Sequence, residues 1–423
     1  MVSRVILFAT TTGYQIRAFD DAATRLGIEL RIASDSCDQL DDPWRDRAVA
    51  VRFHDLVSSL RALDVAVLER APDGVIAVGD RPAVLAAHAA RRFGVRWHSP
   101  DAVECSRHKL KTRQRFRDAG LATPAFEAVE DGVSRATAVA RSEHLLPAVV
   151  KAVSLSGSRG VIRADTREEL AAALTRVRRL LDSHEVRVLR DPEASTIVVE
   201  QFIEGREYAI EAVVDRGRLH VIALFDKPDP LDGPFFEETI YASPSRASGP
   251  DQAAIVTAIE RAVRALGLTH GPVHGECRLG PSGVTVLEVA ARPIGGLCAK
   301  AVTVVDRHGQ RASLEELLLR HAIGQDISDW SPNKEGSAVM MVPIPAEGVY
   351  RGVEGMDSAQ HVRHVTDVRI TAKADQLLTP LPEGATYLGF IFARAASAED
   401  AERAVREAHA KLQFRIDRAL PLV

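Results

Sequence analysis

Cysteine is scarce in this sequence, and its four copies lie far apart. Cys37, Cys105, Cys277 and Cys298 form no CxxC pair among the 423 residues. This spacing argues against a cysteine-rich zinc site and a disulfide framework, and it favours a reducing cytoplasm. Long apolar runs are lacking as well, because the stretch at 5–9 is too short for a signal peptide or a membrane span. We therefore expect a cytoplasmic protein without a membrane partner, in which 5–9 belongs to a buried first strand.

An excess of positive charge is also missing. The formal net charge is −4, with acidic and basic residues mixed along the chain, so a nucleic-acid partner is not expected. Hydrophobic residues make up 46% of the chain and charged residues 26%, which is typical of a soluble globular protein. At 423 residues the chain is too long for one ordinary core, and it predicts two to four domains.

The first hundred residues alternate between short apolar runs and helical patterns. We expect the strands and helices of a small doubly wound domain at 4–9, 15–26, 28–33, 65–68, 74–78 and 81–93. Its first turn lacks the GxGxxG motif, so a nicotinamide or flavin enzyme has weak support. We interpret this domain as a scaffold that also forms part of a substrate wall.

The most informative stretch predicts a β-hairpin with two glutamates face to face. A three-residue loop at 281–283 would pair Gly280 with Val284, and the same register places Glu276 directly opposite Glu288. Two opposed carboxylates repel each other unless a cation lies between them, and Mg²⁺ prefers carboxylate oxygens together with waters or phosphate oxygens. The pair therefore predicts a magnesium–nucleotide site. The alternative is an exposed hairpin face with weak surface ion pairs.

Two further segments suit the phosphates and the base of a nucleotide. An apolar strand delivers Lys151 just before the small-residue loop 154–160, whose backbone N–H groups would cover phosphates. No GK[ST] follows, so this is not a Walker A motif, and a plain linker is the alternative. Further on, 200–203 form a hinge that would seat an adenine, while Glu207 would accept ribose hydroxyls; here an ordinary turn is the alternative.

In this order, the three segments resemble the ATP-grasp superfamily over residues of about 100–330. Within it, the chain looks most like the carboxylate–amine ligases of the L-amino acid ligase branch. The resemblance implies a multidomain fold of the α/β and α+β classes. A Rossmann-like pre-ATP-grasp domain would cover 1–105, an ATP-grasp domain 106–330 with a small lid subdomain at about 120–200, and a lid-like C-terminal α+β domain 331–423.

The resemblance also implies a role for each residue that matches the superfamily pattern. Contacts with ATP are implied for Lys109, Lys151, Ser156, Gly157, Ser158, Gly160, Glu200, Gln201, Phe202, Ile203 and Glu207. Glu276 and Glu288 would hold two Mg²⁺ ions, with Mn²⁺ as a substitute. Lys227 and Arg292 would contact the phosphoryl group during its transfer.

One departure from the superfamily pattern concerns the metal site. Many members carry asparagine two residues after the second glutamate, whereas this chain has Ala290. The predicted register places His274 opposite Ala290, on the face of the two glutamates. Our hypothesis is that His274 partly fills the vacant role, the alternative being a histidine that is hydrogen-bonded within the sheet.

The reaction implied by the resemblance joins a carboxylic acid to an amine. The carboxylate attacks the γ-phosphorus of ATP, and an amine then displaces phosphate from the acyl-phosphate to give an amide, ADP and phosphate. An amino acid is the expected acyl donor, and a dipeptide is the expected kind of product. The residues expected at the substrates are Glu237 and Glu238 for an amino group, Arg278 or Arg292 for a carboxylate, and Gly295 and Gly296 in a turn beside them.

The expected partners are thus a small carboxylate and a small amine, and homodimer formation is left open. Two alternatives share the ATP site. The chain could be an enzyme like those of purine biosynthesis or like biotin carboxylase, or it could be a non-catalytic module that binds ATP without using it.

Overall fold

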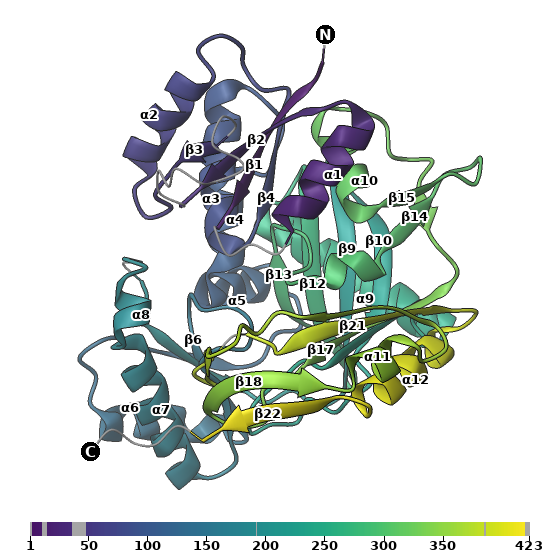
Figure 1. Cartoon of the computed structure of the whole chain (residues 1–423). Coiled ribbons are helices and arrows are strands. Elements are labelled where there is room, and N and C mark those ends of the chain that lie inside the picture. The colour runs from purple at the N-terminus through teal and green to yellow at the C-terminus, as the bar shows by residue number, and fades with distance from the viewer. Residues whose placement is uncertain (1, 11–14, 36–47, 192, 385, 419–423) are drawn as a thin grey trace.

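The N-terminal part of the chain is a parallel sheet covered by helices. The computed structural model describes residues 2–10, 15–35, 48–191, 193–384 and 386–418 (Figure 1), so Cys37 lies outside the described residues. The sheet order is β3-β2-β1-β4, with every pair parallel. Its elements are β1 (Arg4–Ala9), α1 (Ile16–Leu26), β2 (Glu29–Ser34), β3 (Ala48–Ala50), α2 (Leu56–Ala66), β4 (Gly74–Val78) and α3 (Asp80–Phe93).

The strand expected at 65–68 is wrong. Val65 and Ala66 are the end of α2, and the side chains of Val65 and Leu68 are largely exposed. A short apolar run fits either a strand or the last turn of a helix. The helix is favoured here because the carboxylate of Asp55 accepts a hydrogen bond from the backbone N–H of Ser58 and so caps the N-terminus of α2.

A second, antiparallel sheet has its own core. Its order is β5-β8-β6-β7, and α7 packs against it. Thr166 and Glu169 form a capping box at the N-terminus of α7. The elements of this region are α4 (Pro100–Arg107), α5 (Lys109–Asp118), β5 (Phe126–Val129), α6 (Arg135–Ser142), β6 (Ala148–Ala152), β7 (Val161–Ala164), α7 (Arg167–Leu181), α8 (His184–Arg187) and β8 (Ile197–Gln201). Leu170, Leu174 and Val177 of α7 are buried against the strands.

An eight-stranded sheet forms the centre of the molecule, in the order β13-β12-β9-β10-β11-β17-β21-β19. Its strands are β9 (Arg206–Asp215), β10 (Arg218–Asp226), β11 (Ile240–Ser243), β12 (Gly271–Gly280), β13 (Gly283–Ala290), β17 (Gly336–Val342), β19 (Val365–Ile370) and β21 (Gly389–Ala395). The sheet therefore continues across residue 331, where we expected a domain boundary. The domain limits stay predictions.

Helices and two small sheets complete the fold around this centre (Figure 1). They comprise α9 (Gly249–Leu266), β14 (Thr303–Val305), β15 (Arg311–Ser313), α10 (Leu314–Ala322), β16 (Ser331–Pro332), β18 (Gly348–Glu354), α11 (Met356–Gln360), β20 (Leu377–Leu378), α12 (Ala398–His409) and β22 (Gln413–Asp417). None of the helices within the described ranges combines the length and the apolarity that crossing a membrane would require.

The hairpin of β12 and β13 has a shorter turn than expected. Gly280 pairs with Gly283, so the expectation that it pairs with Val284 is wrong. A bulge follows, in which Leu287 is the extra residue on β13, and it restores the expected register. Glu276 does lie opposite Glu288 as predicted. His274 likewise lies opposite Ala290.

Candidate active site

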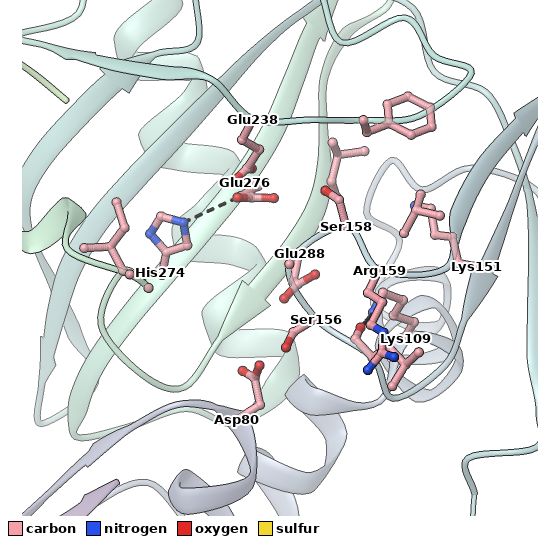
Figure 2. Close-up of a pocket in the computed structure, with 18 of the residues that line it drawn as sticks. Asp80, Lys109, Lys151, Ser156, Ser158, Arg159, Glu238, His274, Glu276 and Glu288 are labelled. Atoms are coloured by element: carbon pink, nitrogen blue, oxygen red, sulfur yellow. Dashed lines mark hydrogen bonds and ion pairs between the residues drawn. The ribbon is translucent and has the colours of Figure 1, made fainter. Parts of the chain in front are cut away.

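A cavity of about 560 Å³ lies among three sheets (Figure 2). These are the parallel N-terminal sheet, the antiparallel sheet of β5 to β8 and the eight-stranded sheet. The predicted site residues that line the cavity are Lys109, Lys151, Ser156, Gly157, Ser158, Glu200, Gln201, Phe202, Ile203, Glu207, Glu238, His274, Glu276, Arg278, Glu288, Arg292, Gly295 and Gly296. Segments nearly two hundred residues apart are thus brought to one place. Three other predicted residues, Gly160, Lys227 and Glu237, are described but do not line the cavity.

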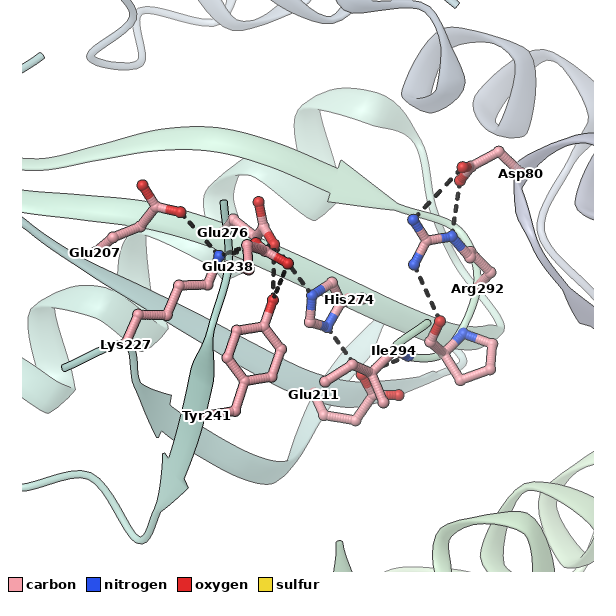
Figure 3. A network of polar contacts seen from close by, with 11 residues as sticks. Asp80, Glu207, Glu211, Lys227, Glu238, Tyr241, His274, Glu276, Arg292 and Ile294 are labelled. Carbon is pink, nitrogen blue, oxygen red and sulfur yellow. Dashed lines mark hydrogen bonds and ion pairs between the residues drawn. The ribbon is translucent and has the colours of Figure 1, made fainter. Parts of the chain in front are cut away.

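The ammonium group of Lys227 lies behind the cavity wall, among three carboxylates (Figure 3). Its Nζ is 2.8 Å from Glu207 and 3.0 Å from Glu276, and it also donates to Glu238. Burial would lower the pKa of Lys227, but these three negative charges outweigh it and hold the pKa well above its ordinary value. Tyr241 closes the cluster, because its hydroxyl donates to Glu238 at 2.9 Å and lies 3.3 Å from Glu276.

Glu276 and Glu288 differ in their surroundings although they face each other. Burial would raise the pKa of Glu276, but Lys227 and His274 outweigh it and lower the pKa well below the ordinary value. Glu288 has no hydrogen bond or ion pair to any other described residue, and it lines the cavity. A carboxylate left free next to an ionised one offers hard oxygen ligands, so the donor set fits Mg²⁺.

His274 is held by a buried glutamate that sequence reasoning missed. Its Nδ1 lies 3.1 Å from Oε2 of Glu211, which also accepts the backbone N–H of Ile294 at 3.0 Å, while its Nε2 lies 3.4 Å from Glu276. Burial would lower the pKa of His274, but Glu211 and Glu276 outweigh it and raise the pKa to about 9. The available signal for Glu211 was an acid in the apolar middle of β9, between Ile210 and Ala212.

Lys151 points into the cavity from β6 and is fixed by a second buried acid. Its Nζ lies 2.6 Å from Glu200, whose two oxygens also accept hydrogen bonds from Arg113 at 2.8 and 3.0 Å. Both carboxylate oxygens of Glu200 are therefore engaged in these ion pairs. An adenine bound in the hinge would contact the backbone of Glu200 and not its side chain. Arg113 was missed because it lies in the middle of α5, among exposed charged residues.

The hinge after β8 is built around an aromatic ring. The guanidinium groups of Arg163 and Arg278 lie 4.0 and 5.0 Å from the centre of the Phe202 ring, which also stacks with Phe236. Arg278 also donates to Glu207 at 3.0 Å, to the carbonyl of Ile203 at 2.7 Å and to the carbonyl of Leu231. Its donors thus hold the hinge against the eight-stranded sheet, although we had expected Arg278 to face a substrate carboxylate.

The remaining predicted residues have structural contacts of their own. The backbone N–H of Gly160, at the end of the loop 154–160, donates to the carbonyl of Pro382 at 2.8 Å. Glu237 is half-buried, and burial raises its pKa. The turn at Gly295 and Gly296 is fastened to the N-terminal region, because the side-chain amide of Gln15 donates to the carbonyls of Ile294 and Gly296.

Arg292 reaches across to helix α3 of the N-terminal region. Its Nε donates to Oδ1 of Asp80 at 2.8 Å, and both side chains are largely buried (Figure 3). Burial would lower the pKa of Arg292, but the charge of Asp80 outweighs it and raises the pKa above its ordinary value. Sequence reasoning missed Asp80. The available signal was an acid in the first turn of the helix that follows β4.

Comparison with known proteins agrees with this architecture. The ATP-grasp domain family matches residues 144–301, and the family described as L-amino acid ligase C-terminal domain 2 matches 340–417. The crystal structure of L-amino acid ligase from Bacillus licheniformis is 25% identical, with a TM-score of 0.77 over 98% of this chain and 99% of that one.

Two relatives match at the sequence level over shorter stretches. The protein y4rH of Sinorhizobium fredii is 26% identical over 332 residues, which are 77% of this chain. Alanine–anticapsin ligase of Bacillus subtilis is 28% identical over 210 residues, or 46% of this chain. The matched regions span 64% and 42% of those two proteins, less than two thirds of each. Together, the fold and the two domain matches show that the chain contains an ATP-grasp domain and an L-amino acid ligase C-terminal domain.

Proposed function

We propose that the chain is an ATP-dependent carboxylate–amine ligase, which forms an amide through an acyl-phosphate and releases ADP and phosphate. An amino acid is the proposed acyl donor. The observation that carries the proposal is the opposition of Glu276 and Glu288 on one wall of a cavity whose other walls present Lys151 and the loop 154–160.

The side chains divide the proposed work between them. Lys109 and Lys151 bind the nucleotide phosphates, the hinge 200–203 binds the adenine base, and the loop 154–160 excludes water from the acyl-phosphate. Mg²⁺ held by Glu276 and Glu288 would neutralise charge on the transferring phosphoryl oxygens. Arg292 supplies a fork of N–H donors to the same oxygens.

Three residues receive roles that follow from their contacts. Lys227 faces three carboxylates from behind the wall, so we propose that it holds Glu276 and Glu238 in place and does not reach the γ-phosphate. Burial and the charge of Glu276 raise the pKa of Glu238 to about 7, although Lys227 opposes them. A second cation would relieve that repulsion, so the ammonium group of the donor amino acid suits Glu238. His274, held between Glu211 and Glu276, would keep Glu276 in its ionised form.

The first prediction concerns the metal pair. Glu288→Gln should lower ATP-dependent amide formation at least about 10²-fold, because it removes charge where the metal is held. The measurement is ADP release with pairs of L-amino acids, with mass spectrometry of the product. The control is Glu168→Gln, an exposed acid in the first turn of α7, which should keep the wild-type rate.

Other results would contradict the proposal. Unchanged turnover in Glu288→Gln would show that the opposed glutamates do not hold the catalytic metal. ATP binding without ADP release for every acid and amine would indicate a non-catalytic module. ADP release that requires bicarbonate or a nucleotide precursor would point to the purine-biosynthesis or biotin-carboxylase alternative.

A further inference from the structure

Asp80 is a half-buried acid in the cavity that the proposed reaction has not used. It is the first residue of α3, directly after β4, and it lines the cavity with Thr10 and Gln15. Its carboxylate binds Arg292, with Oδ1 2.8 Å from Nε and Oδ2 3.5 Å from Nη2 (Figure 3). Helix α3 of the N-terminal region therefore contributes a carboxylate to the cavity.

The ion pair with Arg292 must loosen if Arg292 serves the phosphoryl group. Two other cations act on Asp80 through their charge, Lys109 and Arg107. Neither donates to it: Lys109 donates to the carbonyl of Leu155, and Arg107 donates to Asp191 and Glu104. Once Arg292 turns to the phosphoryl oxygens, Asp80 is left as a half-buried carboxylate without a hydrogen-bonding cation. Such a group needs a new cation or a proton.

The location of Asp80 suits the second substrate. Figures 2 and 3 both place Asp80 at one end of a row of side chains that runs through Glu276 to Glu238. If the donor amino acid is held at Glu238, its carboxyl group lies toward the middle of this row. An amine that attacks this activated carboxyl group comes from the opposite end of the row. That end is formed by the carboxyl edges of β1 and β4 and by Asp80. Carboxyl edges of parallel strands are where ligands bind in open α/β sheets.

We propose that Asp80 binds the ammonium group of the incoming amine and accepts its proton, an inference that rests on the proposed ligase function. The ammonium group passes one proton to the Asp80 carboxylate. The free amine then attacks the carbonyl carbon of the acyl-phosphate, a C–N bond forms, and the C–O bond to phosphate breaks with its electron pair on the leaving phosphate. The second proton leaves the nitrogen with that phosphate.

The environment of Asp80 matches this role. Burial raises the pKa of Asp80, and the charge of Arg292 outweighs burial and lowers it in the structure described here. When Arg292 moves to the phosphoryl group, the effect of burial remains, so the carboxylate becomes a better base at the moment when the amine must lose its proton. The same movement couples phosphoryl transfer to capture of the amine.

The test separates the two half-reactions in the Asp80→Asn variant. Hydroxylamine is uncharged at neutral pH, so it attacks an acyl-phosphate without a base and gives a hydroxamate. We expect ATP-dependent hydroxamate formation to stay within about threefold of wild type, while amide formation with an amino acid falls by about 10²–10⁴-fold. Raising the pH should restore part of the amide formation, because the free amine is then present in solution. Asp101→Asn, an exposed acid in the first turn of α4, should match wild type in both reactions.

Two results would overturn the inference. Amide formation that stays near wild type in Asp80→Asn would show that Asp80 is not the base. An equal loss of hydroxamate and amide would show that Asp80 only positions Arg292. If Asp80→Asn fails to fold, Asp80→Glu decides, since it keeps a carboxylate and should retain both reactions with a changed pH profile for the amide alone. Absence of both products in the wild-type protein would instead disprove the ligase function itself.

Discussion

Glu200 is a buried carboxylate that binds two cations, Arg113 and Lys151. Burial would raise its pKa, but the two cations outweigh burial and lower it from 4.5 to about 2. A carboxyl group whose pKa is lower in the folded state stabilises the fold above its unfolded pKa, and that stability is lost as the pH falls through the folded pKa. This pKa shift corresponds to a contribution of about 3 kcal/mol to the free energy of unfolding at neutral pH.

We expect Glu200→Gln to lower the free energy of unfolding by about 3 kcal/mol at pH 7, because two buried cations lose their counter-charge. The difference from wild type should shrink as the pH falls from 4.5 toward 2. Urea unfolding at several pH values measures it. Glu204→Gln, an exposed acid four residues away, should change the free energy by less than about 0.5 kcal/mol. A deficit that stays constant with pH would contradict the charge explanation.

At the scale of elements, the hinge 200–203 is fixed to the β12–β13 hairpin by close backbone packing at Gly205. Gly205 has φ +123°, and a Cβ there would lie 2.4 Å from the carbonyl oxygen of Leu279. Gly283, in the hairpin turn, also has a positive φ of +97°, but no atom lies within 4 Å of its Cβ position. A side chain at either glycine would strain the backbone, but only a side chain at Gly205 would also clash. Comparing the two substitutions therefore distinguishes backbone strain from steric crowding.

We expect Gly205→Ala to lower the free energy of unfolding by more than about 3 kcal/mol and Gly283→Ala by about 1 kcal/mol, since only the first adds a clash to the strain. Chemical unfolding measures both. Gly205→Ala should also weaken ATP binding, because the clash moves the hinge away from β12. Equal losses in the two variants would mean that the crowding at Gly205 relaxes without cost.

Across the whole molecule, the loop 154–160 is tied to a segment more than two hundred residues away. Gly160 donates to the carbonyl of Pro382, and Arg159 donates to the carbonyl of Glu383 at 2.6 Å. The carboxylate of Glu383 in turn binds Arg176 of α7 at 2.6 and 2.8 Å. The C-terminal part of the chain thus holds the cover of the proposed phosphate site.

This tie predicts that Arg176→Ala speeds hydrogen exchange of the amides at 156–161 several-fold, because Glu383 loses its anchor. Global stability should fall by less than about 1 kcal/mol, since the pair is partly exposed. Exchange followed by mass spectrometry measures the effect. Arg179→Ala, an exposed arginine on the same helix, is the control and should leave exchange in the loop unchanged.

Local patterns predicted much of the fold and fewer of the contacts. The opposed Glu276 and Glu288 followed from hairpin pairing, although the turn was shorter and a bulge at Leu287 compensated for it. The strand expected at 65–68 was wrong because a short apolar run does not distinguish a strand from a helix end. Glu207 next to Lys227, Glu211 next to His274 and Asp80 next to Arg292 lie on other elements of the fold, so no spacing in the sequence revealed these partners.

Local sequence patterns were enough to predict the superfamily pattern, the β12–β13 hairpin and the residue types around the nucleotide, because period-two alternation and turn residues act over a few positions. Only the tertiary structure decided which charges meet. Glu211 lies under His274, Lys227 lies among three acids, and Asp80 faces Arg292 across 212 positions of sequence. Burial makes such pairings strong and obligatory, and burial is a property of the packed sheets, which no local stretch of the chain possesses.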